Sequence, residues 1–146
     1  EKRAGDELAL IPIHGAFKEV LSMLGKGYVA ALVADQNVKR KNAVFVDFFQ
    51  RKTDVNKNIA KLVMVSKAPL VPAFILRDNG GFLLEIFPEV PVETTEDSEM
   101  DIKALCQAFT KAIEEYVRKY PQQWFWIHNR WRTRPMEEKM KEDNLR

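Results

Sequence analysis

A run of seven apolar residues, "YVAALVA" at 28–34, places the strongest constraint on the fold of this 146-residue chain. The run is too short to cross a bilayer and lacks the alternation of a half-buried strand. It is typical of a strand that is buried on both faces, which requires helices on both sides of its sheet. The run ends at Asp35-Gln36.

The flanking segments supply helices and further strands. Glycines end an amphipathic helix before residue 28, and Asp78-Asn79-Gly80-Gly81 predicts a hairpin turn. The spacing of apolar residues predicts helices over about 15–24, 54–66 and 99–119, and strands over 43–49, 68–76 and 82–87. We therefore expect one α/β domain over residues 1–146, with a central, mostly parallel or mixed sheet flanked by helices. Residues 136–146 are expected to form a polar helical tail.

Composition limits the classes of function. Apolar residues make up 46% of the chain and charged residues 30%, which is an ordinary globular balance. The net charge of +2 gives no general argument for nucleic-acid binding. The single cysteine, Cys106, lies on a helical apolar stripe, and we expect it to be a small core residue. The chain opens on Glu1 rather than methionine, so we expect a piece of a longer or processed protein.

Asp35 is the sharpest candidate for a functional residue. It directly follows the apolar run, and the carboxyl ends of strands line the binding crevice in open α/β sheets. The structural alternative is that Asp35 caps a turn. Nearby, Lys39, Arg40 and Lys41 suit either phosphate binding or a solvated rim.

The segment "WFWIHNRWRTRP" at 124–135 alternates tryptophans with basic residues. Such alternation suits a membrane–water interface or stacking on single-stranded nucleic acid. In a third interpretation the tryptophans cover the sheet, and Arg130 pairs with an internal carboxylate. If the segment is extended, Arg130, Arg132 and Arg134 share one face. His128 has no His or Cys partner at ligand spacing, so we predict no metal site.

Four stretches together resemble one family over about residues 8–135. They are "LGKGYVAALVADQN", "NAVFVDFF", "APLVPAFILRDNGGFLLEIFPEVP" and "QAFTKAIEEYVRKYPQQWFWIHNRWRTRP". The chain resembles the C-terminal half of the lipid A biosynthesis acyltransferases, the lauroyl and myristoyl transferases of Gram-negative bacteria. Its closing block is the most specific part of the match. Gln50, where the family tends to have glycine, and Asn129, where it usually has a second arginine, depart from the pattern.

The resemblance implies a partial glycerolipid-acyltransferase-like fold and an enzyme at the cytoplasmic face of the inner membrane. Such an enzyme transfers a fatty acyl chain from acyl carrier protein to a lipid A precursor, without a further cofactor and without nucleic acid. Asp35 matches the family's active-site aspartate in a supporting role. Gln36, Arg40, Arg130 and Arg132 are the expected substrate-binding residues. The alternative is a non-catalytic module that binds lipid or another anion through its basic aromatic segment.

The family also has a His-x-x-x-x-acid catalytic motif, whose spacing His14 and Glu19 reproduce. In the family the motif lies several dozen residues before the Asp-Gln, whereas His14 is only 21 positions before Asp35. On a continuous helix, residues five apart point about 140° away from each other. We therefore predict that His14 is a helix-entry residue and that this chain, soluble by itself, is inactive without the family's catalytic pair and membrane anchor.

Overall fold

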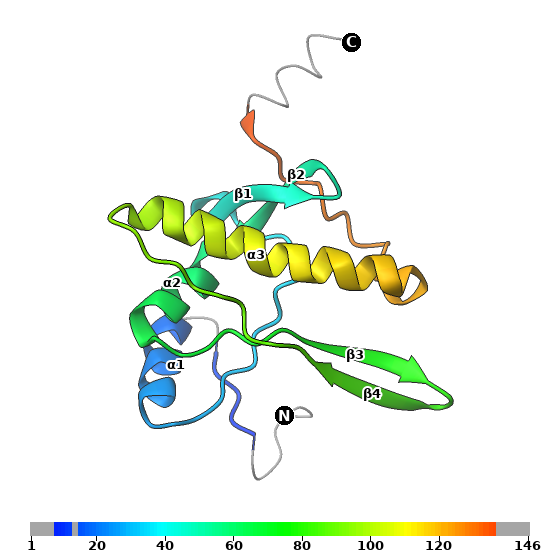
Figure 1. Ribbon diagram of the computed structural model, residues 1–146, viewed down its shortest axis with the longest axis horizontal. Helices are drawn as coiled ribbons and strands as arrows, with labels where there is room; N and C mark the ends of the chain where they lie inside the picture. Colours follow the sequence, from blue (N-terminus) through cyan, green and yellow to red (C-terminus); the bar gives the residue numbers. More distant parts are fainter. Residues whose placement is uncertain (1–7, 13–14, 137–146) are drawn as a thin grey trace.

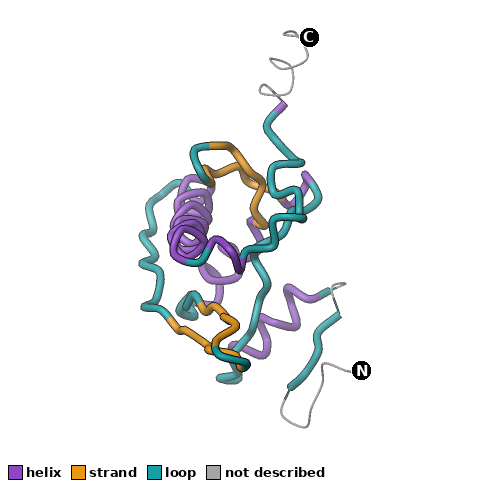
Figure 2. Tube along the Cα trace, turned by 90° about the vertical axis from the view of Figure 1, so that its right-hand side faces the viewer, coloured by secondary structure: helices purple, strands orange, loops and turns teal. Residues whose placement is uncertain are grey.

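A long helix lies between two β-hairpins in this protein (Figures 1 and 2). The computed structural model describes residues 8–12 and 15–136. In chain order the elements are α1 Ala16–Gly25, η1 Arg40–Asn42, β1 Ala43–Phe48, β2 Arg51–Asn56, α2 Lys57–Ser66, β3 Ala73–Asp78, β4 Gly81–Ile86, α3 Ser98–Lys119 and η2 Pro121–Gln123. The α/β class is confirmed. None of the helices over these residues is long and apolar enough to cross a membrane.

The β3–β4 hairpin agrees with the sequence prediction. Its strands pair antiparallel from Ala73↔Ile86 to Asp78↔Gly81. Asn79 and Gly80 form the turn, with φ angles of 41° and 85°. Two successive positive φ angles match the strand twist, and Asn-Gly adopts them easily. The first strand starts at residue 73 rather than 68, because Pro72 has no N–H to donate to a ladder.

The β1–β2 hairpin was only half predicted. β1 forms as expected, but residues 51–56, of which 54–56 were expected to begin a helix, pair with β1 as a second strand. The turn residues Phe49 and Gln50 have φ angles of 51° and 60° without any glycine, so the sequence carries no turn signal there. Helix α2 starts only at Lys57, where the Asn56 side chain caps it by accepting a hydrogen bond from Asn58 N at 3.1 Å.

The prediction of a central, mostly parallel or mixed sheet is not confirmed. The sheets among the described residues are two separate antiparallel pairs, and the run 28–34 belongs to neither of them. Val29 is 96% exposed and Val33 is 85% exposed. A strand is defined by the neighbour that it pairs with, and an apolar composition does not supply that neighbour. Residues 28–34 therefore approach Asp35 as an unpaired segment.

Helix α3 supplies the centre of the core, and its predicted range is correct to within one residue. Its buried stripe packs against β1, β2 and α2, with Val46, Val55, Ile59, Ile102, Leu105, Cys106 and Phe109 in one cluster. Its N-cap is Asp97, which accepts from Glu99 N and Met100 N. Cys106 is fully buried, and burial raises the pKa of its thiol to about 12. The prediction that Cys106 is a core residue is confirmed.

Candidate functional site

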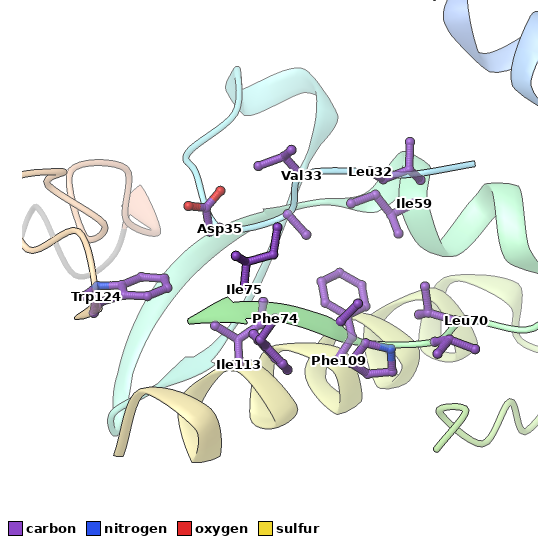
Figure 3. A pocket seen from close by; sticks show the side chains of 14 residues that line it. Leu32, Val33, Asp35, Ile59, Leu70, Phe74, Ile75, Phe109, Ile113 and Trp124 are labelled. Carbon is purple, nitrogen blue, oxygen red and sulfur yellow. The ribbon is translucent and has the colours of Figure 1, made fainter. Parts of the chain in front are cut away.

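An apolar cavity of about 500 Å³ lies between the segment 32–35, strand β3 and helix α3. Figure 3 shows Leu32, Val33 and Asp35 on one side, Phe109 and Ile113 on the other, and Ile75 between them. Trp124 lies at the end where Asp35 is found (Figure 3). Asp35 is the one charged residue among the described residues that line the cavity. A mainly apolar cavity with a single polar group is the usual form of a small-molecule site.

One carboxylate oxygen of Asp35 is buried but accepts no hydrogen bond from the described residues. The residue is half-buried, and its Oδ1 is buried with no hydrogen bond to any described residue. An unpaired buried oxygen costs about 1–3 kcal/mol, more when it is charged, so it requires an explanation. The prediction that Asp35 lies in a concave surface is confirmed. The prediction that it ends a central strand is wrong, because residues 28–34 are unpaired.

The backbone that follows Asp35 is bound to a second carboxylate, which the sequence analysis missed. Asp54 on β2 is fully buried. Its Oδ1 accepts from Asn37 Nδ2 at 2.5 Å, and its Oδ2 accepts from Val38 N at 2.7 Å. Asp54 was expected at the start of a helix, so its burial had no signal in the sequence pattern.

The closing segment contributes Arg130 and His128 to the same region. Arg130 is only 2% exposed; its Nη1 donates to Asp54 O at 2.6 Å and lies 3.9 Å from Asp54 Oδ1. Burial lowers the pKa of Arg130, while the nearby charges of Asp54 and Asp35 oppose that shift. His128 Nε2 accepts a hydrogen bond from Asn37 N at 3.2 Å, which requires an unprotonated Nε2. Arg130 was predicted to bind substrate, but its guanidinium is buried against Asp54, which is the alternative considered from the sequence, pairing with an internal carboxylate.

Within the described part of the chain, the side chains of the other predicted substrate-binding residues are not hydrogen-bonded to Asp54, His128 or Arg130, although Gln36 lies in the same loop between Asp35 and Asn37. Gln36 and Arg132 are exposed, and exposed Arg40 donates to Arg134 O at 2.9 Å. Their binding of substrate stays a prediction. His14 lies outside the described residues, as do residues 137–146 of the expected tail. No group of three or more His, Cys, Asp or Glu within residues 8–12 and 15–136 is placed to hold a metal ion.

The basic aromatic segment is divided between packing and solvent. Trp131 donates to Phe48 O at 3.3 Å and packs on the Phe48 ring, while Trp124 lines the cavity. Trp126 is 53% exposed and the neighbouring Ile127 is 88% exposed. The segment turns repeatedly rather than extending, so the prediction that three arginines share one face is wrong: Arg130 points inward and Arg132 outward.

Comparison with known proteins gives a consistent assignment. Residues 1–133 match the model of the bacterial lipid A biosynthesis acyltransferases. The chain is 29% identical over 123 residues to a lipid A biosynthesis acyltransferase of Haemophilus influenzae, covering 83% of this chain and 37% of the relative. It is 29% identical over 122 residues to the lipid A biosynthesis palmitoleoyltransferase of Escherichia coli, covering 82% and 38%.

A third relative is named for phosphatidylinositol mannoside rather than lipid A. The chain is 25% identical over 126 residues to a phosphatidylinositol mannoside acyltransferase of Mycolicibacterium smegmatis, covering 84% of this chain and 40% of the relative. The chain thus spans about two fifths of the length of these curated relatives. The match to the family model extends over nearly the whole chain and confirms the resemblance noted in its sequence. This chain belongs to the bacterial lipid A biosynthesis acyltransferase family.

Proposed function

We propose that the protein transfers a fatty acyl chain from acyl carrier protein to a hydroxyl group of a lipid A precursor. The observation that supports this most directly is the apolar cavity with Asp35 as its one charged lining residue among those described. The cavity, at about 500 Å³, has the size of an ordinary ligand site, and each buried methylene of an acyl chain contributes about 0.8 kcal/mol. A fatty acyl chain is the substrate class that such a lining favours.

The reaction needs a group that removes a proton from the acceptor hydroxyl. The oxygen then attacks the thioester carbon, an ester bond forms, the carbon–sulfur bond breaks, and the proton ends on the released thiol. Asp35 acts in a supporting role by holding an imidazole or a cation in the orientation that this transfer requires. Its unpaired Oδ1 leaves a hydrogen-bonding position for that partner.

The decisive substitution is Asp35→Asn in the natural full-length protein. We expect acyl transfer to fall by about a hundredfold or more, the scale on which acid–base groups act. The assay supplies acyl carrier protein and coenzyme A thioesters as donors, and a lipid A precursor and a phosphatidylinositol mannoside as acceptors. Asp47→Asn is the matched control, because Asp47 is exposed on β1 and its carboxylate pairs across the hairpin with Lys52. Transfer that survives in Asp35→Asn contradicts the assignment.

The chain by itself is proposed to be inactive. His14 and Glu19 have the spacing of the family motif, but they lie too close in the sequence to Asp35, only 21 positions from His14, to match the family arrangement. Residues 1–146 are assayed beside the full-length protein under the same conditions. Transfer by residues 1–146 that disappears in His14→Ala reverses this prediction and restores His14 as a base.

The site of action is proposed to be the cytoplasmic face of the inner membrane. Exposed Phe125, Trp126 and Ile127 give the closing segment an apolar tip, and exposed Arg132 lies nearby in the sequence. Apolar and aromatic side chains beside a cation suit a membrane–water interface.

Gln36, Arg40 and Arg132 are proposed to contact the anionic substrate. The same features support the second candidate, a non-catalytic module that binds anionic lipid, which binding without transfer in the assay above favours.

A further inference from the structure

The loop that carries Asp35 is fixed from one side by a single buried carboxylate. Asp54 accepts one hydrogen bond from the Asn37 side chain and one from the Val38 backbone, through its two different oxygens. Hydrogen bonds to an ionised acceptor are roughly twice as strong as neutral ones. Two successive residues after Asp35-Gln36 are therefore fixed against β2.

The closing segment fixes the same loop from the other side. His128 Nε2 accepts from the Asn37 backbone N–H at 3.2 Å. The Arg130 carbonyl accepts from Asn37 Nδ2 at 3.1 Å and from Thr53 Oγ1 at 2.7 Å. Asn37 thus joins residues that lie more than ninety positions away in the chain to a buried strand next to the core.

Arg130 completes the arrangement by joining the closing segment to β2. Its guanidinium donates to the Asp54 carbonyl, and both side chains are withdrawn from water. A buried ion pair contributes little net stability but is costly to break, so it favours one arrangement over its alternatives. Asp54, His128 and Arg130 do not line the cavity, whereas Asp35 does.

We propose that Asp54, His128 and Arg130 are positioning residues that hold the 35–38 loop so that the Asp35 carboxylate stays at the cavity. They act through Asn37 and Val38 and do not touch substrate. The position of the loop follows from the contacts alone, whereas its use in acyl transfer rests on the function proposed above. The closing segment and β2, rather than the unpaired apolar segment 28–34, set the geometry of the site.

A matched pair of substitutions at His128 tests this in the full-length protein. His128→Gln keeps a side-chain acceptor for the Asn37 N–H, and His128→Leu removes it. We expect His128→Leu to lower kcat by about fivefold to tenfold, the value of one hydrogen bond, while KM changes by less than about twofold. His128→Gln is expected to keep most of the activity. Equal losses in the two variants overturn the proposal.

A double-variant cycle separates positioning from general destabilisation. Asp54→Asn replaces one acceptor oxygen by a donor that faces the loop. If Asp54 acts through Asp35, the Asp35→Asn/Asp54→Asn pair is no less active than Asp35→Asn alone. A further loss that multiplies the two single effects contradicts the proposal. Asp47→Asn, on the partner strand of the same hairpin, is the control.

Hydrogen–deuterium exchange reports the loop independently of catalysis. We expect the amides of residues 37 and 38 to exchange about tenfold faster in His128→Leu and Asp54→Asn, and at the wild-type rate in His128→Gln and Asp47→Asn. If the wild-type protein transfers no acyl group, the proposed function fails, and this exchange still decides whether the loop is held. Unchanged exchange in both His128→Leu and Asp54→Asn rejects the positioning role.

Discussion

Asp54 and Arg130 form an ion pair from which water is excluded. This burial favours a structural role for both side chains. The Asp54 side chain is fully buried, and the Arg130 side chain is 3% exposed. Two charges in such a place are retained only when hydrogen bonds compensate the lost hydration. Asn37, Val38 and the Asp54 carbonyl provide those bonds. Arg130 is therefore a structural cation.

Removal of the Arg130 charge leaves Asp54 buried and without its cation. We expect Arg130→Met to lower the free energy of unfolding by about 3–5 kcal/mol, the cost of breaking a buried pair. Arg132→Met is the matched control, because Arg132 is exposed two positions later, and we expect a change within about 0.5 kcal/mol. Urea unfolding of both variants measures the difference. Equal stability of the two variants shows that Arg130 is not structural.

Cys106 is a free cysteine that is fully buried in the core. Burial raises the pKa of its thiol to about 12, so at pH 9 only about one thousandth of it is thiolate. The thiolate is the reactive form, so we expect no reaction with Ellman's reagent in the folded protein and full reaction in urea. Because the folded pKa is raised, this thiol contributes stability that is present below pH 9 and lost between pH 9 and about 12. Rapid labelling of the folded protein at pH 8 contradicts this placement.

At the scale of elements, the two hairpins differ in how their turns are encoded. Asn79-Gly80 adopts positive φ angles easily, whereas Phe49 and Gln50 do so against the preference of their side chains. A glycine at position 50 would remove part of this strain. Tertiary contacts hold the strained turn: Phe49 N donates to Glu114 Oε2 at 2.7 Å, and the Arg118 guanidinium lies over the Phe49 ring.

Gln50→Gly is expected to stabilise the protein. The left-handed conformation costs a side-chain-bearing residue about 1–2 kcal/mol, and the extra flexibility of glycine in the unfolded chain offsets about 0.5–1 kcal/mol. We expect a net gain of about 0.5–1 kcal/mol, measured as a higher urea midpoint at an unchanged slope. Gln50→Ala keeps the strain and is the control. A lower midpoint in Gln50→Gly means that the Gln50 side chain contributes more than its strain costs.

The sequence correctly predicted the elements that are determined by residues close together in the chain. Helix α3 follows from its apolar spacing, and the β3–β4 turn follows from Asn79-Gly80. Strand β2 was missed because it pairs through a turn without glycine and carries the polar residues Thr53 and Asp54 inside. Asp35 was found because a carboxylate after an apolar run is conspicuous. Asp54 and His128 were not found, because their contacts join residues far apart in the chain.

At the scale of the whole molecule, apolar surface is unevenly distributed. Around α3 the core is dense, whereas the hairpin β3–β4 exposes Ile75, Phe82 and Ile86, and the segment before Asp35 exposes Val29 and Val33. The arrangement in Figure 1 places α3 between the two hairpins, so only one face of each hairpin is covered by that helix. The Asp35 cavity lies along this boundary between core and exposed apolar surface.

The contact proposed above between the exposed tip of the closing segment and a membrane is directly testable. Ile127 is 88% exposed, Trp126 is 53% exposed with its Nε1 donating to Pro121 O, and Arg132 is exposed. One basic residue near an anionic bilayer contributes about 1 kcal/mol, which corresponds to about a fivefold change in binding. We therefore expect Arg132→Gln to weaken co-sedimentation of the full-length protein with anionic vesicles about fivefold, and Trp126→Ala to weaken binding to anionic and neutral vesicles alike.

Salt distinguishes the two contributions. At 1 M salt the Debye length is about 3 Å, so the effect of Arg132→Gln is expected to disappear while that of Trp126→Ala persists. Lys103→Gln is the control, because Lys103 is exposed on α3 and far from residues 125–132 in the sequence. Buried Arg130 is left intact in every variant, so a change in binding does not reflect a loss of folding. If Arg132→Gln, Trp126→Ala and Lys103→Gln bind as the wild type does, the closing segment contributes to packing and to the position of Asp35, and its proposed contact with a membrane is rejected.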